Sequence, residues 1–435
     1  MRKSNLQFWL GPLLSVLEHP HSARSRPTRD TATTRATAAL STLQTWYNAQ
    51  TGLWNTAGWW NSANIMTVIA DLVLLDTSTK GQAERVFRNT FIRAPAGNPL
   101  PGVENENENS ELRRRNEDGM IYDKVLHQKS GMVSTTYGPD SKWSSLISPN
   151  FIYDRGTIGP QKILYISNAA ASEWLDGFYD DDAWWALAWI AAFDVTKEPA
   201  YLLLAEDIFA ALLKAWPTNC GGGIWWSYKR TYANAIANEL FLSLAAHLAN
   251  RVGTGSREIK AFYVDWAKRE LDWFRASGMI NERGTVNDGL TADCKNNNFT
   301  TWSYNQGVIL SGLVELNRAS PDPSYLSLAS STAKAAITEL SDASGILHDK
   351  CGPNCGGDAS QFKGIFIRGL QKLHEAAPDE VFERTIRVNA ESVWKNDRDA
   401  KGRMSTNWAG PVVEGANATT HSSAMEALIA DIAVT

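Results

Sequence analysis

The chain has 435 residues and a mass of 48.0 kDa, and 43% of its residues are hydrophobic while 20% are charged. These proportions exclude a disordered or collagen-like chain, and the length is sufficient for a large buried core. Because 47 acidic residues outnumber 42 basic ones, the net charge is -5 and a polyanion such as nucleic acid is an unfavourable partner.

The N-terminal segment has the pattern of a signal peptide. Two basic residues precede an apolar run from Leu6 to Leu17, which is too short to span a membrane. We expect residues 1–36 to be a signal peptide or a disordered segment, and the protein to be secreted or held in a cell wall without stable membrane insertion. The C-terminal sequence shows no pattern for a GPI anchor, and the sequons at Asn298 and Asn417 fit a secreted glycoprotein.

Helical periodicity dominates the chain after this segment. Apolar residues recur at spacings of three and four, which is typical of amphipathic helices. These stripes lie at 65–73, 201–212, 236–248, 262–273, 309–316, 362–370 and 424–432. About a dozen helical segments and almost no alternating strand pattern predict an all-α fold.

Loops rich in Gly, Asn and Trp alternate with these helices, at 52–64, 219–238 and 296–307. Tryptophan is unusually frequent, with 18 residues in 435. An indole has a flat apolar face and an N–H at its edge, which suits a sugar ring, although many of these residues will belong to the core. Polar and aromatic helix starts at a loose spacing of roughly fifty residues suggest a toroid of helical hairpins. We expect one such domain over residues 37–435, in a monomer.

One stretch, residues 95–157, lacks any sustained period and contains the run ENENENSELRRRNEDG. A structureless segment of this length is unusual inside a compact domain. We interpret it as an irregular insertion, a disordered loop or a product of incorrect gene assembly, and assign no chemistry to it.

The four cysteines form no C-x-x-C pair, and the histidines show no spacing typical of metal ligands. We therefore expect no metal and no cofactor. Cys351 and Cys355 lie in a Gly/Pro-rich loop and could close a small disulfide, which leaves Cys220 and Cys294 as a second candidate pair. Free buried thiols are the alternative, and disulfides would indicate an oxidising compartment.

The strongest candidate site is the run Asp180, Asp181 and Asp182 at the start of an apolar helix. A single aspartate there is explained as a helix cap. Three adjacent carboxylates repel one another, so at least one must be protonated or strongly hydrogen-bonded if the site is dry. Glycoside cleavage requires two carboxyl groups whose pKa values are pushed apart.

The string YDDDAWWALAWI resembles the signature of glycoside hydrolase family 76, the endo-α-1,6-mannanases of fungi and bacteria, in which an Asp-Asp pair is followed two residues later by Trp-Trp. The resemblance extends through WWNSAN (59–64), GGIWW (222–226), NAIANELFLSLAA (234–246), WSYNQGVILSGL (302–313) and FKGIFIRGL (362–370). It implies an (α/α)6 barrel that binds α-1,6-mannan or mannooligosaccharide and cleaves it with retention and without a metal.

By this resemblance Asp180 is the nucleophile and Asp181 the general acid/base. Aromatic and polar residues near helix starts could stack on sugar rings or bond their hydroxyls, or could instead pack in the core and cap helices. These candidates are Trp59, Trp60, Asn64, Tyr179, Asp182, Trp185, Trp225, Trp226, Asn238, Trp302, Tyr304, Asn305 and Gln306. The expected activity is endo-acting hydrolysis of α-1,6-mannosidic linkages, with a cell-wall transglycosylase or a non-catalytic mannan-binding toroid as alternatives.

Overall fold

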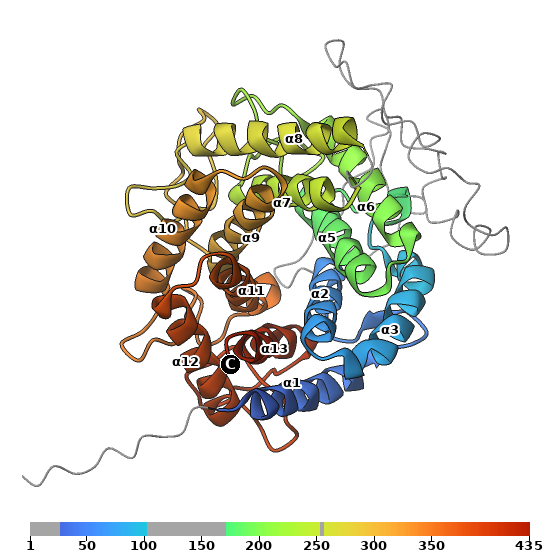
Figure 1. Ribbon diagram of the computed structural model, residues 1–435, viewed down its shortest axis with the longest axis vertical. Coiled ribbons are helices and arrows are strands. Elements are labelled where there is room, and N and C mark those ends of the chain that lie inside the picture. The colour runs from blue at the N-terminus through green and yellow to red at the C-terminus, as the bar shows by residue number, and fades with distance from the viewer. Residues whose placement is uncertain (1–26, 102–170, 253–255) are drawn as a thin grey trace, which may run out of the picture.

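The computed structural model describes residues 27–101, 171–252 and 256–435. The predicted signal peptide and most of the predicted insertion lie outside the described residues. Twelve α-helices occur in the described part, and they alternate along the chain between an outer and an inner ring (Figure 1). The all-α, toroidal architecture predicted from the sequence is therefore confirmed.

The inner ring closes on itself, because each inner helix contacts its two inner neighbours and the last contacts the first. Its members are α2 (Trp59–Leu75), α5 (Tyr179–Thr196), α7 (Ala235–Arg251), α9 (Ser303–Ala319), α11 (Phe362–Ala376) and α13 (Ala418–Ala433). The outer ring consists of α1 (Arg29–Leu43), α3 (Lys80–Arg93), α6 (Pro199–Leu212), α8 (Arg257–Ala276), α10 (Pro323–Leu340) and α12 (Glu380–Asn396).

Short elements connect these helices. The only strands in the described part are β1 (Tyr47–Asn48) and β2 (Leu53–Trp54), which form one antiparallel pair. The 3-10 helices are η1 (Gln44–Trp46), η2 (Thr77–Thr79), η3 (Ala94–Gly97), η5 (Ala171–Glu173), η6 (Leu213–Ala215) and η8 (Gly357–Ser360).

The two rings differ in how much of each helix is buried. In α2, nearly every residue from Trp59 to Val73 is buried, because inner neighbours, an outer helix and the barrel interior surround it. In α8, a stripe that includes Phe262 and Phe274 is buried, and the remaining faces carry charged residues. The apolar stripes predicted from the sequence lie on these buried faces.

The domain begins earlier than the predicted boundary at residue 37, because α1 starts at Arg29. The Thr28 hydroxyl caps this helix by accepting the Thr31 N–H, and Ala32 and Ala36 are buried. The helix packs on α13. The sequence pattern missed the start of this helix because the buried residues before Leu40 are all alanines, which give no strong hydrophobic stripe.

The predicted insertion also begins too early. Ala94 starts η3, and the Asn98 side chain donates to the backbone carbonyls of Glu173 and Leu175 at 2.8 and 2.9 Å. Leu100 is buried as well. Residues 95–101 therefore belong to the folded domain.

All four cysteines are paired in two disulfides, Cys220–Cys294 and Cys351–Cys355. The first joins the loop before α7 to the loop before α9, and the second lies within the loop before α11. The candidate pairing is confirmed, and the alternative of free thiols is wrong.

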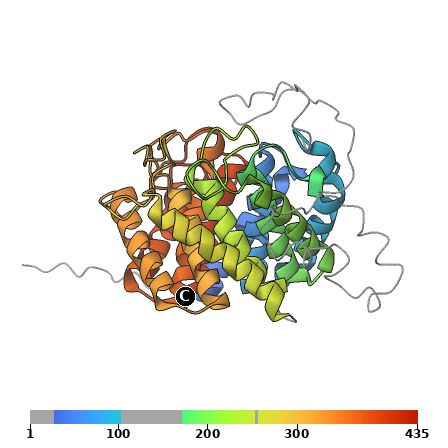
Figure 2. The ribbon, with the colours of Figure 1, turned by 90° about the horizontal axis from the view of Figure 1, so that it is seen from above.

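The inner helices begin at one end of the barrel, which we call the loop end, and finish at the other, which we call the base. Figure 2 shows the ring from its edge, with the connecting loops gathered along one side. Toward the base a cavity of about 620 Å³ is lined by residues of five inner helices, most of them in the second halves of these helices. No helix in the described residues is long and apolar enough to cross a lipid bilayer.

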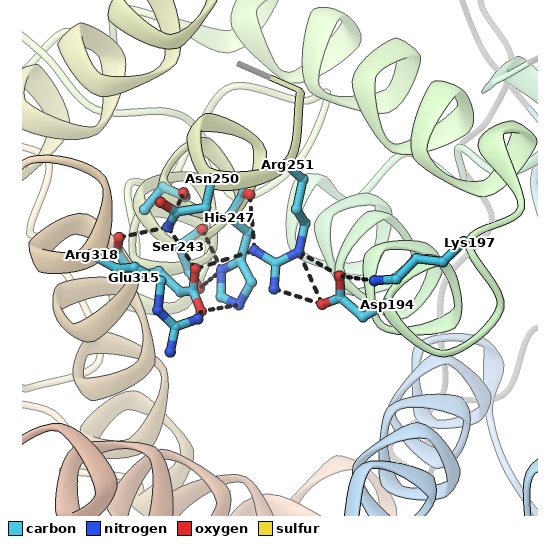
Figure 3. Close-up of polar contacts among 9 residues, drawn as sticks. Asp194, Lys197, Ser243, His247, Asn250, Arg251, Glu315 and Arg318 are labelled. Atoms are coloured by element: carbon cyan, nitrogen blue, oxygen red, sulfur yellow. Dashed lines mark hydrogen bonds and ion pairs between the residues drawn. The ribbon is translucent and has the colours of Figure 1, made fainter. Parts of the chain in front are cut away.

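Paired charges line this basal cavity (Figure 3). Arg251 forms ion pairs with Asp194 at 2.6 Å and with Glu315 at 3.1 Å, and Arg318 reaches Glu315 at 2.8 Å. Basic side chains at helix C-termini complement the negative ends of the helix dipoles. We therefore interpret this network of ion pairs as a structural feature that holds the ends of the inner helices together at the base.

Candidate active site

The three aspartates occupy the first turn of α5 at the loop end, after the N-cap residue Phe178 and the first helical residue Tyr179. The positive end of the helix dipole favours negative charge at this position. Asp180 is half-buried, whereas Asp181 and Asp182 are 1% and 0% exposed. Three identical residues therefore have different surroundings.

Asp182 has a structural role. One of its carboxyl oxygens accepts the Asp176 N–H at 3.0 Å, and the other accepts the Tyr228 hydroxyl at 3.1 Å. Burial raises the pKa of Asp182 well above its ordinary value, and the charges of Asp181 and Asp180 add to this effect. Its prediction as a sugar ligand is corrected, because the fully buried side chain holds the turn before α5. The expectation that one of the three carboxyls is protonated or firmly hydrogen-bonded is confirmed.

The loop 216–234 supplies the partner of Asp180. The Trp226 indole Nε1–H donates to Asp180 Oδ2 at 3.1 Å. The loop backbone is fixed beside α5, because the Tyr179 N–H donates to the Trp226 carbonyl at 2.9 Å and the Tyr228 N–H to the Gly177 carbonyl at 3.0 Å. The predicted site residues Asp180 and Trp226 are thus in direct contact.

A group of aromatic side chains lies beside these residues, on the first turns of α2, α9 and α11. The rings of Tyr304 and Phe362 stack with centroids 3.7 Å apart, and Trp302 and Trp60 lie 5.5 and 6.4 Å from Phe362. Trp60 also donates its Nε1–H to Asp358 at 2.7 Å. The structure therefore brings together the predicted residues Trp60, Trp302 and Tyr304.

Several carboxyl groups surround Tyr304. Burial is the main cause that raises the pKa of its hydroxyl well above the usual value, and the negative charges of Asp288, Asp180, Asp358 and Glu239 contribute in that order. The aspartates of α5 are therefore electrostatically close to the aromatic group.

Asp288 and Asp358 were not predicted from the sequence. Asp288 accepts the Tyr232 hydroxyl in a short hydrogen bond, and Asn297 donates to the same hydroxyl at 2.9 Å. Burial raises the pKa of Asp288. Each aspartate stands next to a glycine, a context usual for turns, so the sequence carried no signal for a site.

Two predicted tryptophans belong to the core instead. Trp185 is fully buried, and its ring lies 4.7 Å from the rings of both Trp59 and Trp174. Trp59 is 7% exposed and also stacks on Trp174. Their predicted contact with sugar is corrected, because these rings fill the space between α2, α5 and η5.

Four further residues predicted to bind sugar make other contacts in the structure. Asn64 is buried, and its Oδ1 accepts an N–H of Arg368, a residue that lines the basal cavity. Tyr179 is buried with its ring 4.6 Å from Tyr228. Asn305 is fully buried with no hydrogen bond to its amide in the described part of the chain, and Trp225 is half-buried against the core. None of these positions supports the predicted contact with sugar.

Asn238 and Gln306 bind backbone. The Asn238 amide bonds both the N–H and the carbonyl of Ile224, and the Gln306 amide bonds both groups of Val286. Both side chains are fully buried. Their predicted role as sugar ligands is corrected, because loop backbone satisfies their donors and acceptors.

The chemistry of this site is that of carboxyl groups and aromatic rings. Aromatic faces suit the C–H patches of a sugar, and carboxylates accept hydrogen bonds from hydroxyls. Several acidic groups within one site disfavour an anionic ligand. Among the described residues, no group of three or more His, Cys, Asp or Glu side chains is placed to hold a metal ion.

The family model described as "Glycosyl hydrolase family 76" matches residues 117–435, a segment that includes the aspartates of α5. The chain belongs to glycosyl hydrolase family 76. The resemblance carried by the aspartate and tryptophan motif is thereby confirmed, and the chain is a member of an enzyme family.

Fungal relatives of this family member are similar over part of their length. A mannan endo-1,6-alpha-mannosidase of Candida albicans is 30% identical over 261 residues, which are 52% of this chain and 56% of that protein. A mannan endo-1,6-alpha-mannosidase of Saccharomyces cerevisiae is 29% identical over 220 residues, 46% of this chain and 47% of that protein. The chain thus spans about half the length of the curated relatives it matches.

Solved structures share the fold of this family 76 member. One is an inactive variant of an alpha-1,6-mannanase of Salegentibacter, with two consecutive aspartates replaced, in complex with alpha-1,6-mannotetrose. It is 17% identical, covers 93% of this chain and 99% of its own, and superimposes with a TM-score of 0.67. This likeness confirms the barrel architecture.

Proposed function

We propose that the protein is a secreted endo-acting α-1,6-mannosidase that hydrolyses mannan with retention of anomeric configuration. The observation that carries this proposal is the pair Asp180–Asp181 on the first turn of α5, beside the indole of Trp226. Family membership supports glycoside hydrolysis, and the names of the fungal relatives support α-1,6-mannan as the substrate. The inactive Salegentibacter variant supports a catalytic role for an aspartate pair.

In the first step, a carboxylate oxygen of Asp180 attacks the anomeric carbon while the bond from that carbon to the glycosidic oxygen breaks. Asp181 gives its proton to the departing oxygen, which leaves as the hydroxyl of the released mannan fragment. The helix dipole and the Trp226 N–H stabilise the ionised carboxylate of Asp180, as a nucleophile requires.

In the second step, Asp181 removes a proton from a water molecule, and the resulting oxygen attacks the anomeric carbon of the mannosyl ester. The ester bond to Asp180 breaks, and both carboxyl groups return to their starting states. Two inversions at one carbon leave the product with the configuration of the substrate.

The loop end fits a neutral polysaccharide better than a charged one. Trp60, Trp302 and Tyr304 supply aromatic surface, and Asp288 and Asp358 supply acceptors for sugar hydroxyls. Both disulfides fit the proposed extracellular location, because such bonds persist in oxidising compartments.

The test is chromatography of the products from linear α-1,6-mannan with the wild type, Asp180→Asn and Asp181→Asn. We expect short mannooligosaccharides from the wild type and at least a hundredfold loss of rate in each variant, a scale typical of acid–base groups. Products longer than the starting chains would indicate transfer to a sugar acceptor. Binding by a folded wild type without any products would contradict the enzymatic proposal and support a binding protein.

A further inference from the structure

Three buried amide side chains hold loops in the same way, and we call each of them an amide clamp. Each is Asn or Gln on a helix, with an oxygen that accepts a loop N–H and a nitrogen that donates to a loop carbonyl and to the carbonyl four residues earlier in the chain. The clamps are Asn238 on α7, Gln306 on α9 and Asn389 on α12. All three are fully buried.

The Asn238 clamp fixes the loop 216–234 at Ile224. The Ile224 N–H reaches Asn238 Oδ1 at 2.7 Å, and Asn238 Nδ2 donates to the carbonyls of Ile224 and Asn234 at 3.0 and 2.7 Å. The backbone presses closely on this clamp, since a Cβ added to Gly223 would lie 2.7 Å from Asn238 Oδ1 and 2.3 Å from the Trp273 ring. Ile224 therefore has little freedom to move.

The clamped residue is two positions from the indole that bonds the proposed nucleophile. Trp226 extends from the fixed backbone, its carbonyl accepts the Tyr179 N–H, and its Nε1–H reaches Asp180 Oδ2 at 3.1 Å. A hydrogen-bond donor aimed at a carboxylate favours its ionised form. The position of this donor thus depends on a side chain in the neighbouring helix α7.

We propose that Asn238 is a positioning residue for catalysis, which aims the Trp226 N–H at Asp180 by clamping Ile224. This inference rests on the proposed function, because it assumes that Asp180 is the nucleophile. Asn238 itself touches no reacting atom. Its effect passes through the loop backbone and the indole to the carboxylate.

Asn389 provides a matched control. It is equally buried, and its three hydrogen bonds have the same pattern, with the Leu347 N–H as donor and the Gly345 and Thr385 carbonyls as acceptors. The loop that it holds lies between α10 and α11, whereas the loop with Trp226 lies before α7 and Asp180 lies on α5. Asn389→Asp therefore alters the same pattern of hydrogen bonds as Asn238→Asp, but in a loop that does not carry Trp226.

The test measures kcat, KM and the pH profile of kcat/KM on α-1,6-mannan for Asn238→Asp, Asn389→Asp and the wild type, with melting temperatures as a check of folding. Aspartate retains the acceptor but turns a carboxylate oxygen toward two carbonyls in both variants. We expect Asn238→Asp to lose kcat by about tenfold or more, because a displaced catalytic contact is costly. The acidic limb of the pH profile of Asn238→Asp should move to higher pH, since the Trp226 N–H that favours the ionised carboxylate of Asp180 is displaced.

Asn389→Asp should lose stability to a similar extent and keep the kcat and pH profile of the wild type. Trp226→Phe, which removes only the Nε1–H donor, should move the acidic limb in the same direction. Adding Asn238→Asp to Trp226→Phe should then move it little further. If Asn238→Asp does not fold, Asn238→Ala is compared with Asn389→Ala, because neither change buries a new charge.

An Asn238 variant that folds and keeps the kcat and acidic limb of the wild type would overturn the inference. So would an Asn389 variant with the same kinetic losses, because the effect would then be one of general stability. These outcomes leave the proposed function intact as long as the wild type cleaves mannan and Asp180→Asn does not. A wild type without cleavage would instead contradict the proposed function.

Discussion

The three aspartates at the start of α5 differ in their contacts. Asp180 is half-buried beside the Trp226 indole, while Asp182 is fully buried between the Asp176 N–H and the Tyr228 hydroxyl. Burial holds the pKa of Asp182 well above its ordinary value, which favours the neutral form of its carboxyl. The side chain at position 182 therefore does not need to be a carboxylic acid to make these two hydrogen bonds.

This difference predicts the effect of replacing each aspartate by asparagine. Asp182→Asn should fold and retain measurable activity, because an amide matches a neutral carboxyl in shape and can bond the same two partners. We expect it to lose no more than about 2 kcal/mol of stability. Rates on α-1,6-mannan and melting temperatures check this. A loss of activity as large as that of Asp180→Asn, in a folded variant, would show that Asp182 takes part in the chemistry.

Residue identity placed the three aspartates at a helix start, as the structure has them, but did not predict the surroundings of most aromatic and amide side chains. Trp59 and Trp60 are neighbours in the sequence, yet the first packs against Trp185 and the second bonds Asp358. The side-chain amides of Asn238 and Gln306 form hydrogen bonds with the backbone of the loops that precede their helices. These outcomes depend on packing between segments far apart in the chain, which composition and local spacing do not contain.

At the scale of elements, the apolar stripes predicted the helices well, because a helix in a double ring must bury at least one face. The outer helices are also joined by a buried polar contact. The Tyr263 hydroxyl on α8 donates to Glu206 on α6 at 3.1 Å. Burial is the main cause that raises the pKa of Glu206 to about 8, against an ordinary value of 4.5.

The burial of Glu206 predicts a dependence of stability on pH. Between pH 4.5 and 8, Glu206 keeps its proton in the folded state but loses it in the unfolded state, so stability falls as pH rises, by up to about 1.4 kcal/mol per pH unit. Glu206→Gln cannot lose a proton and should have a shallower slope than the wild type. Denaturant unfolding at pH 5, 6 and 7 measures both slopes. Equal slopes would mean that Glu206 is ionised in the folded protein.

Over the whole molecule, α1 of the outer ring meets the last helix, α13, of the inner ring and also contacts α12 of the outer ring. Arg29 at the start of α1 donates to the Ile432 carbonyl of α13 at 2.8 Å, and Arg35 pairs with Glu391 of α12 at 2.7 Å. The sequence predicted the ring but placed its beginning inside α1, because the helix has no strong stripe. The N-terminal residues from Thr28 onward are thus part of the barrel.

Shortening the chain tests this assignment. A chain that begins at residue 27 should melt at the same temperature as the full-length protein. A chain that begins at residue 37 lacks the Thr28 cap and the buried residues Ala32 and Ala36, and should lose about 2 kcal/mol of stability. Thermal unfolding compares the three chains, and equal melting temperatures for all of them would show that the first half of α1 adds nothing.

The proposed function assigns the cleavage of α-1,6-mannan by double displacement to Asp180 and Asp181. The most direct measurement is proton NMR of the first oligosaccharides released from linear α-1,6-mannan, recorded before the new reducing ends equilibrate. Two successive inversions predict that the α anomer appears first, and that Asp180→Asn releases none. Initial release of the β anomer by the wild type would contradict this account, because it would mean a single displacement by water.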